Sequence, residues 1–262
     1  MAYALTWLPK VLRDAGLNVA EQPGWQTRGH GNMGSVKGVM CHHTVGPLTG
    51  NMPSLRVITH GRAGLSGPLA QLGLGRDGTY YVVAAGRAYH AGGGNWQGYK
   101  RGNSSFIGIE AENTGYATGQ KADPWPEVQL DAYRRGAAAI LKKIKADAIM
   151  CCGHKEYRLP PGAKIDPHTL DMDDFRFKVA AIMAEQAPKI SKIPSTDGDG
   201  RPTLSRGSSG MHVGDVQAIL GLIVDGDFGG RTEAAVRQFQ RDHGLRPDGI
   251  VGPRTWATLL AD

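Results

Sequence analysis

Apolar residues recur with a helical period in several parts of the chain. Residues 126–148, PEVQLDAYRRGAAAILKKIKADA, predict a helix with lysines on one face and, on the other, an apolar stripe of Tyr133, Ala137, Ile140, Leu141 and Ile144. Near the N-terminus, Leu5, Leu8 and Leu12 share one face, which predicts a short helix docked on the core. Residues 54–65, SLRVITHGRAGL, follow Pro53 and predict another helix.

Strand patterns lie between these helices. Residues 67–94 and 104–115 are rich in β-branched and aromatic residues, and Asp77-Gly78 is typical of a turn between two strands. GVMCHH, residues 38–43, is an apolar run that ends in two histidines. Strands that alternate with helices predict the α/β class, with a mixed central sheet covered by helices.

A change in composition divides the chain. Residues 187–203, APKISKIPSTDGDGRPT, contain three prolines and no apolar period, which is typical of a linker. We therefore predict a first domain over residues 1–186, a linker over 187–202 and a second domain over 203–262.

The second domain contains a short internal repeat. DGDFGGRT begins at residue 225 and DGIVGPRT at residue 248, 23 residues later. Helical stripes lie before and between the two copies, and Gly252-Pro253 is typical of a helix start, so a small three-helix domain is expected. RGSSG, DVQAIL, DGDFGGRTEAAVRQFQ and GLRPDGIVGPRTWATLL together resemble the family of peptidoglycan-binding domains attached to many wall hydrolases. The resemblance implies that this domain binds bacterial peptidoglycan.

The charge suits an anionic partner. The 262 residues carry a formal net charge of +6, which is compatible with nucleic acid or with a bacterial cell wall. Basic residues are scattered without an aromatic and basic array, so no nucleic-acid partner is predicted. No segment has the length or apolarity of a membrane helix, so no stable membrane insertion is expected.

The chain has three cysteines, Cys41, Cys151 and Cys152. This small and odd number does not fit a disulfide framework. Buried free thiols are the expectation, because free cysteine is among the most buried residue types. A cysteine hydrolase needs an accessible thiol in an electropositive setting, and Cys41 inside an apolar strand does not fit that need.

The histidine pair at residues 42 and 43 needs a chemical explanation. Successive strand residues point to opposite faces, so only one of the two reaches a given site. A second polar region, CCGHKEYRLPPGAKIDPHTLD, contains His154 and Asp166 in a loop rich in proline and glycine. Two imidazoles and a carboxylate are the ligands of a catalytic zinc site with one open position. Spacing alone leaves the third ligand open among Asp166 and four nearby rivals, His168, Asp171, Asp173 and Asp174.

Five motifs in order, CHHT, RDGTYY, AYHAG, IGIE and GHKEYR with KIDPH, are similar to the zinc-dependent N-acetylmuramoyl-L-alanine amidases related to peptidoglycan recognition proteins. The resemblance covers most of residues 36–180. It implies that Zn²⁺ is the cofactor and that its ligands are His42, His154 and Asp166, while His43 turns into the sheet.

The same resemblance implies further roles. Glu110 would activate the attacking water, with Glu112 on the same strand face as its competitor. Lys164 would stabilise the oxyanion, and His90 with Trp96 would contact substrate. Some members of the family have a tyrosine beside the metal in the strand before RDG, whereas this chain has Pro68, Leu69, Ala70 and Gln71 there. Proton transfer is therefore expected to depend more on Glu110.

Together these features predict an enzyme that hydrolyses the bond between N-acetylmuramic acid and L-alanine in peptidoglycan. Two alternatives stay open: a peptidoglycan-binding protein without activity, and a bacterial autolysin. The N-terminus has no signal-peptide pattern. We expect a monomeric phage endolysin that is made in the host cytoplasm and acts on the wall.

Overall fold

The computed structural model describes residues 1–184, 196–245 and 247–261. The chain separates into two compact units, Met1–Glu185 and Gln186–Asp262. Most of the predicted linker, residues 187–195, lies outside the described residues.

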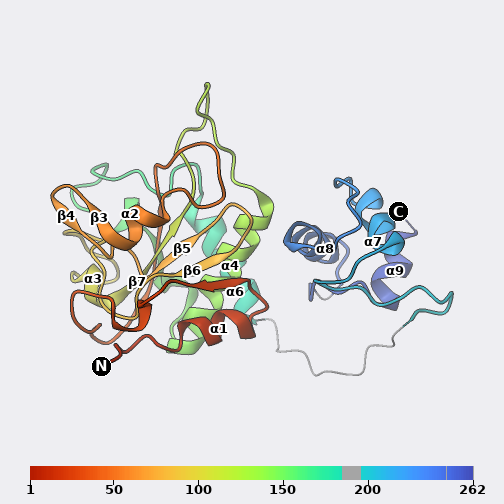
Figure 1. Ribbon diagram of the computed structural model, residues 1–262, viewed down its shortest axis with the longest axis horizontal. Coiled ribbons are helices and arrows are strands. Elements are labelled where there is room, and N and C mark those ends of the chain that lie inside the picture. Colours follow the sequence, from red (N-terminus) through yellow and green to blue (C-terminus); the bar gives the residue numbers. More distant parts are fainter. Residues whose placement is uncertain (185–195, 246, 262) are drawn as a thin grey trace. The chain divides into compact units, whose positions relative to one another are not determined.

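A central sheet lies between the helices of the first unit (Figure 1). It has six strands in the order β1-β6-β5-β7-β2-β8. All neighbouring strands pair in parallel except β5 and β6, which form an antiparallel pair. The strands are β1 (Val19–Glu21), β2 (Gly38–His43), β5 (Leu72–Leu74), β6 (Tyr80–Val82), β7 (Phe106–Ala111) and β8 (Cys151–Gly153). This mixed sheet confirms the predicted α/β class.

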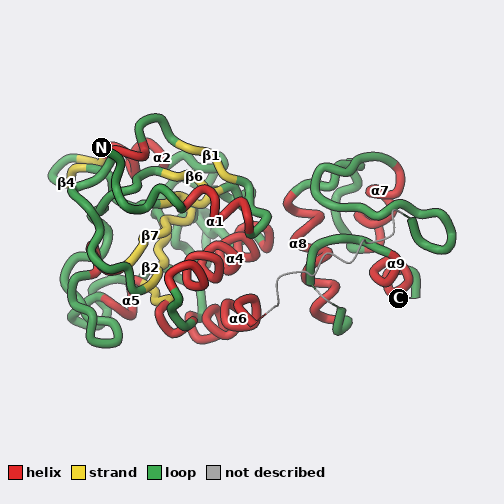
Figure 2. Tube along the Cα trace, turned by 90° about the horizontal axis from the view of Figure 1, so that it is seen from below, coloured by secondary structure: helices red, strands yellow, loops and turns green. Residues whose placement is uncertain are grey.

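Three helices cover one face of the sheet, as Figure 2 shows: α1 (Leu8–Asp14), α4 (Glu127–Ile144) and α6 (Met172–Ala184). The predicted apolar stripe of α4 faces inward, since Tyr133, Ala137, Ile140 and Leu141 are each fully buried. Together with the sheet they form the largest core of the unit. Burial of this stripe removes apolar area from water, which is the main force that holds α4 against the sheet.

Shorter elements and loops lie around the rest of the sheet. They are α2 (Leu55–His60), a hairpin of β3 (Gly61–Arg62) and β4 (Leu65–Ser66), α3 (Gly102–Ser105), α5 (His154–Tyr157), and two 3-10 turns at Trp25–Thr27 and Ala148–Met150. The helix predicted over residues 54–65 was therefore too long. Gly61 ends it because its φ of +85° is outside the helical range, and a Cβ there would lie 2.3 Å from the carbonyl oxygen of Leu65.

The second unit contains α7 (Met211–Ile219), α8 (Gly230–Asp242) and α9 (Pro253–Leu259), packed around Phe228, Val236 and Trp256. Its sequence repeat is also a structural repeat. The Nε2 of Gln217 donates to Asp225 Oδ1, Asp227 O and Thr232 Oγ1. The Nε2 of Gln240 makes the same three bonds 23 residues later, to Asp248 Oδ1, Ile250 O and Thr255 Oγ1.

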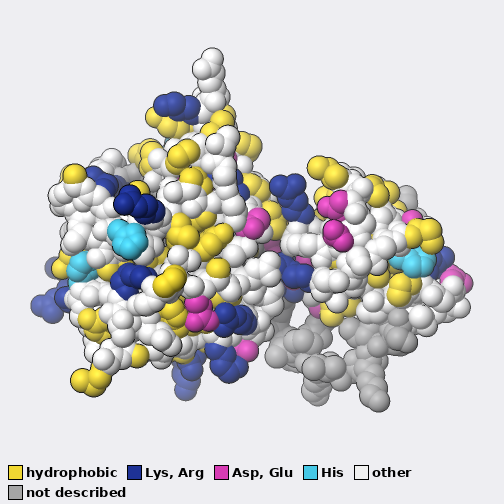
Figure 3. All heavy atoms as spheres, in the orientation of Figure 1, with side chains coloured by type: hydrophobic (Ala, Val, Ile, Leu, Met, Phe, Trp, Pro, Cys, Tyr) yellow, Lys and Arg dark blue, Asp and Glu magenta, His cyan; other side chains and the backbone are white. Residues whose placement is uncertain are grey.

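No helix in the described part of the chain is both long and apolar enough to cross a membrane. On the face of the molecule seen in Figure 3, Lys and Arg side chains are interspersed with apolar and uncharged ones.

Candidate metal centre

A pocket of about 570 Å³ lies where β2 and β7 end, beside α2 and the β3–β4 hairpin. Parallel neighbours in a sheet end at the same edge, which is where α/β proteins commonly bind ligands. The pocket combines polar groups, among them His42, His90, Glu110, His154 and Asp166, with apolar residues from the loop after β2, from α2 and from the hairpin.

The structure brings together the three predicted ligands. One donor atom each from His42, His154 and Asp166 lies within 4.8 Å of the other two, and all three residues are buried. The Nδ1 atoms of His42 and His154 lie 2.9 and 3.0 Å from the same carboxylate oxygen, Oδ2 of Asp166. His42 is the penultimate residue of β2, His154 begins α5 directly after β8, and Asp166 lies in the following loop. Pairing of β2 with β8 therefore places the two imidazoles side by side.

The donor set fits a cation. His154 Nε2 lies 3.0 Å from the carbonyl oxygen of Ala91, which only accepts, so Nε2 is the donor and the neutral ring has its lone pair on Nδ1. That lone pair faces a carboxylate oxygen, an arrangement that is stable only when a metal ion or a proton lies between the two atoms. Burial lowers the pKa of His42 and so opposes a protonated ring there. Two neutral imidazoles and one carboxylate are a donor set that zinc hydrolases use.

Asp166 is suited to be the anionic ligand. Burial by itself would raise the pKa of Asp166, but its contacts with His154 and His42 outweigh burial and hold that pKa far below its usual range. The carboxylate is therefore charged at neutral pH and ready to bind a metal.

His43 also lines the pocket but is not one of the three clustered donors, and it supports the loop that carries Asp166. Its Nδ1 accepts a hydrogen bond of 2.9 Å from the backbone N–H of His168. His168 in turn donates from its own Nδ1 to the carbonyl oxygen of Gly115, at 2.7 Å. The two adjacent histidines thus serve the same region from opposite sides of β2.

The other candidates for the third ligand are engaged elsewhere. His168 contacts Gly115, as described above. Asp171 accepts from the backbone N–H groups of residues 173 and 174 at the start of α6. Asp173 pairs with Arg176, and Asp174 pairs with Lys178.

Glu110 and Glu112 have different surroundings. Glu110 lies opposite His42 in the register of β7 with β2, and its Oε1 is 4.0 Å from His42 Nδ1. Its Oε2 is buried and has no hydrogen-bond partner among the described residues. Burial raises the pKa of Glu110 well above its usual range, and the nearby charge of Asp166 raises it further. A buried carboxylate with a free oxygen beside a metal site is typical of a group that moves protons.

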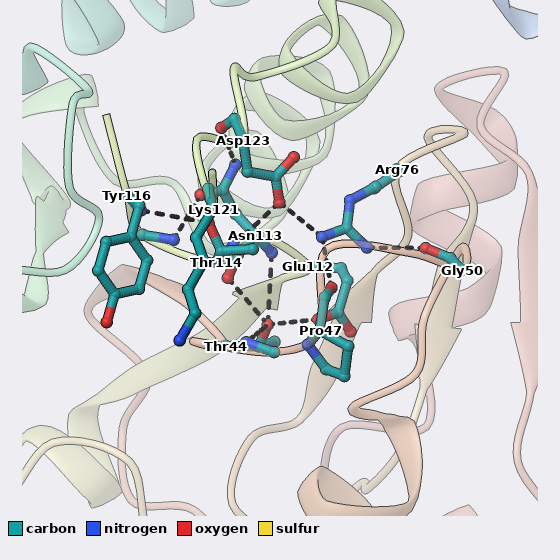
Figure 4. A network of polar contacts seen from close by, with 12 residues as sticks. Thr44, Pro47, Gly50, Arg76, Glu112, Asn113, Thr114, Tyr116, Lys121 and Asp123 are labelled. Carbon is teal, nitrogen blue, oxygen red and sulfur yellow. Dashed lines mark hydrogen bonds and ion pairs between the residues drawn. The ribbon is translucent and has the colours of Figure 1, made fainter. Parts of the chain in front are cut away.

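Glu112 is instead a structural residue. It is fully buried, and its carboxylate accepts from Thr44 Oγ1 at 2.7 Å and from Ser54 Oγ and N at 2.9 Å each. Figure 4 shows the side of this network near Thr44, next to Arg76, which bonds to Asp123. Glu112 therefore ties the end of β7 to the start of α2, and its oxygens are occupied.

The remaining predicted site residues are Lys164, His90 and Trp96, and only the first two line the pocket. Lys164 is exposed and lines the pocket. His90 also lines it, but both of its ring nitrogens have protein partners, His42 Nε2 at 3.1 Å and Phe106 O at 3.2 Å. Trp96 does not line this pocket. Its indole donates to the carbonyl oxygen of Ile149 and packs against the guanidinium of Arg176, so its nearness to His90 in sequence was misleading.

The three cysteines are fully buried, and none lines the pocket. The Sγ atoms of Cys41 and Cys151 are 3.6 Å apart. This thiol contact and burial raise the pKa of Cys151, and burial raises the pKa of Cys152. Thiols of this kind stay protonated, which argues against a cysteine hydrolase.

Comparison with known proteins assigns both parts of the chain. Residues 32–169 match the N-acetylmuramoyl-L-alanine amidase family, and residues 218–259 match the putative peptidoglycan binding domain family. The first match spans more than half of the chain, so the chain belongs to the N-acetylmuramoyl-L-alanine amidase family. The predicted enzyme class is thereby confirmed: the chain is a hydrolase of amide bonds in peptidoglycan, and zinc is the cofactor that the family and the donor set imply.

Individual relatives are similar over shorter stretches. An uncharacterized protein of Kitasatospora aureofaciens is 43% identical over 83 residues, which are 29% of this chain and 70% of that protein. The zinc D-Ala-D-Ala carboxypeptidase of Streptomyces albus G is 45% identical over 62 residues, so that the chain spans 24% of its length.

Among solved structures, the amidase AmiD of E. coli is 19% identical, with a TM-score of 0.46, over 89% of this chain and 91% of that one.

Proposed function

We propose that this protein is a zinc-dependent N-acetylmuramoyl-L-alanine amidase whose metal is held by His42, His154 and Asp166. The observation that carries the proposal is the convergence of two Nδ1 lone pairs on one carboxylate oxygen inside a pocket. When bound there, zinc would polarise the scissile carbonyl and lower the pKa of the attacking water to about 7.

Glu110 would move the proton. Its unpartnered Oε2 can accept a proton from the attacking water, and the same carboxyl can then deliver it to the amine of L-alanine as that amine leaves. The raised pKa of Glu110 supports this role, because a general base works best when its pKa is near the operating pH. The apolar side chain of Leu69 lines the pocket in the segment where some amidases have a tyrosine, and it can take no part in this transfer.

Lys164 would stabilise the transition state. Lys164 lines the pocket, and its charge lowers the pKa of both Glu110 and His42. Negative charge develops on the carbonyl oxygen during attack, and a fixed cation nearby lowers the energy of that state.

Product analysis of digested cell walls tests the activity. Purified peptidoglycan treated with the protein should release stem peptides with free L-alanine amino termini, identified by mass spectrometry, and no new sugar reducing ends. Asp166→Ala, which removes one metal ligand, is the matched control and should release none. New reducing ends would mean a glycosidase, and binding without products would mean the non-catalytic alternative.

We further propose that the enzyme acts as a phage endolysin, a monomer in solution that destroys the wall from inside the host. A catalytic unit joined to a wall-binding unit supports this role. Cells that make the protein in the cytoplasm should keep their turbidity until the membrane is permeabilised and should then lyse within minutes. Separation of daughter cells without loss of turbidity would favour the autolysin alternative, and sedimentation equilibrium would show the oligomeric state.

A further inference from the structure

The outer nitrogens of both histidine ligands contact two consecutive residues. His42 Nε2 lies 3.1 Å from Nδ1 of His90, and His154 Nε2 lies 3.0 Å from the carbonyl oxygen of Ala91. His42, in β2, and His154, at the start of α5, are more than a hundred residues apart in sequence. One short segment thus contacts the far side of both imidazoles.

Donor and acceptor roles along this segment follow from backbone carbonyls, which only accept. Phe106 O accepts from His90 Nε2 at 3.2 Å, so the neutral ring of His90 has its acceptor at Nδ1. That acceptor takes the Nε2 proton of His42, and the lone pair of His42 is left on Nδ1. Ala91 O fixes His154 in the same tautomer. Both rings therefore present Nδ1 toward Asp166.

A single side chain holds this segment in place. Asn103 Oδ1 accepts from the backbone N–H of His90 at 2.8 Å and from that of Ala91 at 2.7 Å. Asn103 lies in α3, directly before β7, and the strand that follows supplies both Phe106 and Glu110. The position of the segment is thus tied to the strand that carries the proposed general base.

The space for His90 is built into the same strand. A Cβ on Gly108 would lie 2.8 Å from Cγ of His90, so only glycine lets the imidazole pack this closely on β7. The ring is buried and both of its nitrogens are bonded, which leaves it without a free polar atom for substrate.

We propose that Asn103 and His90 are positioning residues that orient both imidazoles toward the metal, through a shared outer clamp formed by residues 90 and 91. This inference rests on the proposed zinc site. It replaces the expectation that His90 contacts substrate. Partners in the second coordination sphere are worth roughly 10- to 100-fold in metal affinity in other proteins.

Zinc affinity of the full-length protein, measured by competition with a chromogenic chelator, tests the clamp. Asn103→Leu removes the shared acceptor at similar size and should weaken zinc binding about tenfold or more. Asn103→Asp keeps an acceptor oxygen at the same place. Because the two backbone N–H groups keep their partner, this variant should bind zinc within about threefold of the wild type. Visible absorption of the cobalt-substituted proteins should change for Asn103→Leu and remain as in the wild type for Asn103→Asp.

His90→Phe provides a second test, because it keeps a ring over Gly108 and removes the acceptor for His42. We expect weaker zinc binding and a changed cobalt spectrum in a protein whose circular dichroism matches the wild type. Wild-type zinc affinity in both Asn103→Leu and His90→Phe would overturn the proposal. For His90→Phe, a raised KM at unchanged zinc affinity would restore the substrate role.

The outcome is separable from that of the proposed function. A wild-type protein that binds zinc, loses it on Asp166→Ala, and releases no L-alanine termini from walls would refute the activity and leave the clamp standing. An active wild type with unaffected Asn103→Leu and His90→Phe variants would refute the clamp alone. A wild type that binds no zinc would overturn both.

Discussion

Replacing Glu110 and Glu112 separately by glutamine should affect different properties of the protein. Glutamine has nearly the same shape as glutamate but cannot take up the proton that a general base must accept. Glu110 has a free oxygen at the metal site, whereas the side-chain oxygens of Glu112 accept hydrogen bonds from Thr44 and Ser54. We expect Glu110→Gln to lose activity and Glu112→Gln to lose stability.

The loss of unfolding free energy expected for Glu112→Gln follows from the hydrogen-bond partners of this side chain. Thr44 Oγ1 already accepts from the backbone N–H groups of Gly46 and Asn113, so both of its lone pairs are used and it can only donate to Glu112. In one orientation the new amide nitrogen can donate one N–H to Ser54 Oγ, but its second N–H faces the Thr44 hydroxyl, which has no lone pair left to accept it. In the other it faces the N–H of Ser54. In either orientation one buried donor is left without a partner, which costs about 1–3 kcal/mol. The remaining hydrogen bonds also become weaker, because their acceptor is no longer charged. Glu112→Gln should therefore lose roughly 2–4 kcal/mol of unfolding free energy.

At Glu110 no hydrogen bond to the side chain is lost. Burial of a carboxylate charge is unfavourable, so a neutral amide at this position should leave the unfolding free energy unchanged or raise it. Turnover should fall by about 10²–10⁴-fold, the usual contribution of a general base. Zinc content should stay at the wild-type level, because Glu110 is not one of the three clustered donors.

Two assays on the same preparations decide the matter. Denaturant unfolding followed by tryptophan fluorescence reports mainly on the catalytic unit, because four of the five tryptophans lie within residues 1–184. Initial rates at which soluble muropeptide yields stem peptide with a free L-alanine amino terminus report on turnover. If Glu112→Gln keeps its stability but loses turnover, while Glu110→Gln stays active, the two roles are exchanged and our reading of the pocket is wrong.

Further predictions concern the metal, one close contact and the two units. Exhaustive chelation or His42→Ala should abolish activity and zinc binding, whereas His43→Ala should mainly lower stability; full activity without zinc, or zinc lost only with His43→Ala, would contradict the ligand assignment. Gly46→Ala should destabilise the fold strongly, since its Cβ would lie 1.9 Å from Glu112 Oε1, and thermal unfolding close to that of the wild type would show that the network can rearrange. Residues 1–190 should cleave soluble muropeptide as fast as the whole chain but intact walls more slowly, because the second unit raises the local enzyme concentration. Equal losses on both substrates would refute this tethering account.

Sequence periodicity identified the longest helix and the strand at residues 38–43, but it extended the helix at 54–65 too far and did not predict α6. The stripe of α4 and the apolar run of β2 each identify an element through the faces that the core must bury, and both formed as expected. Strand alternation also predicted that His42 and His43 point to opposite sides. The choice of His42, His154 and Asp166 came from the resemblance to amidases, because spacing alone left several carboxylates open.

Contacts between residues that are far apart along the chain could not be predicted from the sequence. Glu110 and Glu112 share a strand face, and only the approach of α2, through Ser54, distinguishes the occupied carboxylate from the free one. Trp96 was assigned to the site because it is close to His90 along the chain, yet the glycine-rich stretch between them turns the indole toward Arg176. The signal that could have identified Asn103 as important was its polar side chain just before β7, but its two partners depend on tertiary folding.

The hydrogen bonds of Gln217 and Gln240, which repeat in the second unit, have a consequence for the order of folding. Each of the two sets joins residues at most 15 positions apart, so the chain closes only short loops to form it. In the first unit, β2 pairs with β8 across a sequence separation of more than a hundred residues, from Val39 to Cys151. Folding rates fall as the mean sequence separation of contacts rises. After dilution from denaturant, Trp256 should therefore reach its native fluorescence well before the sheet acquires protection from hydrogen exchange, and the wall-binding unit should be folded while the catalytic unit is still forming.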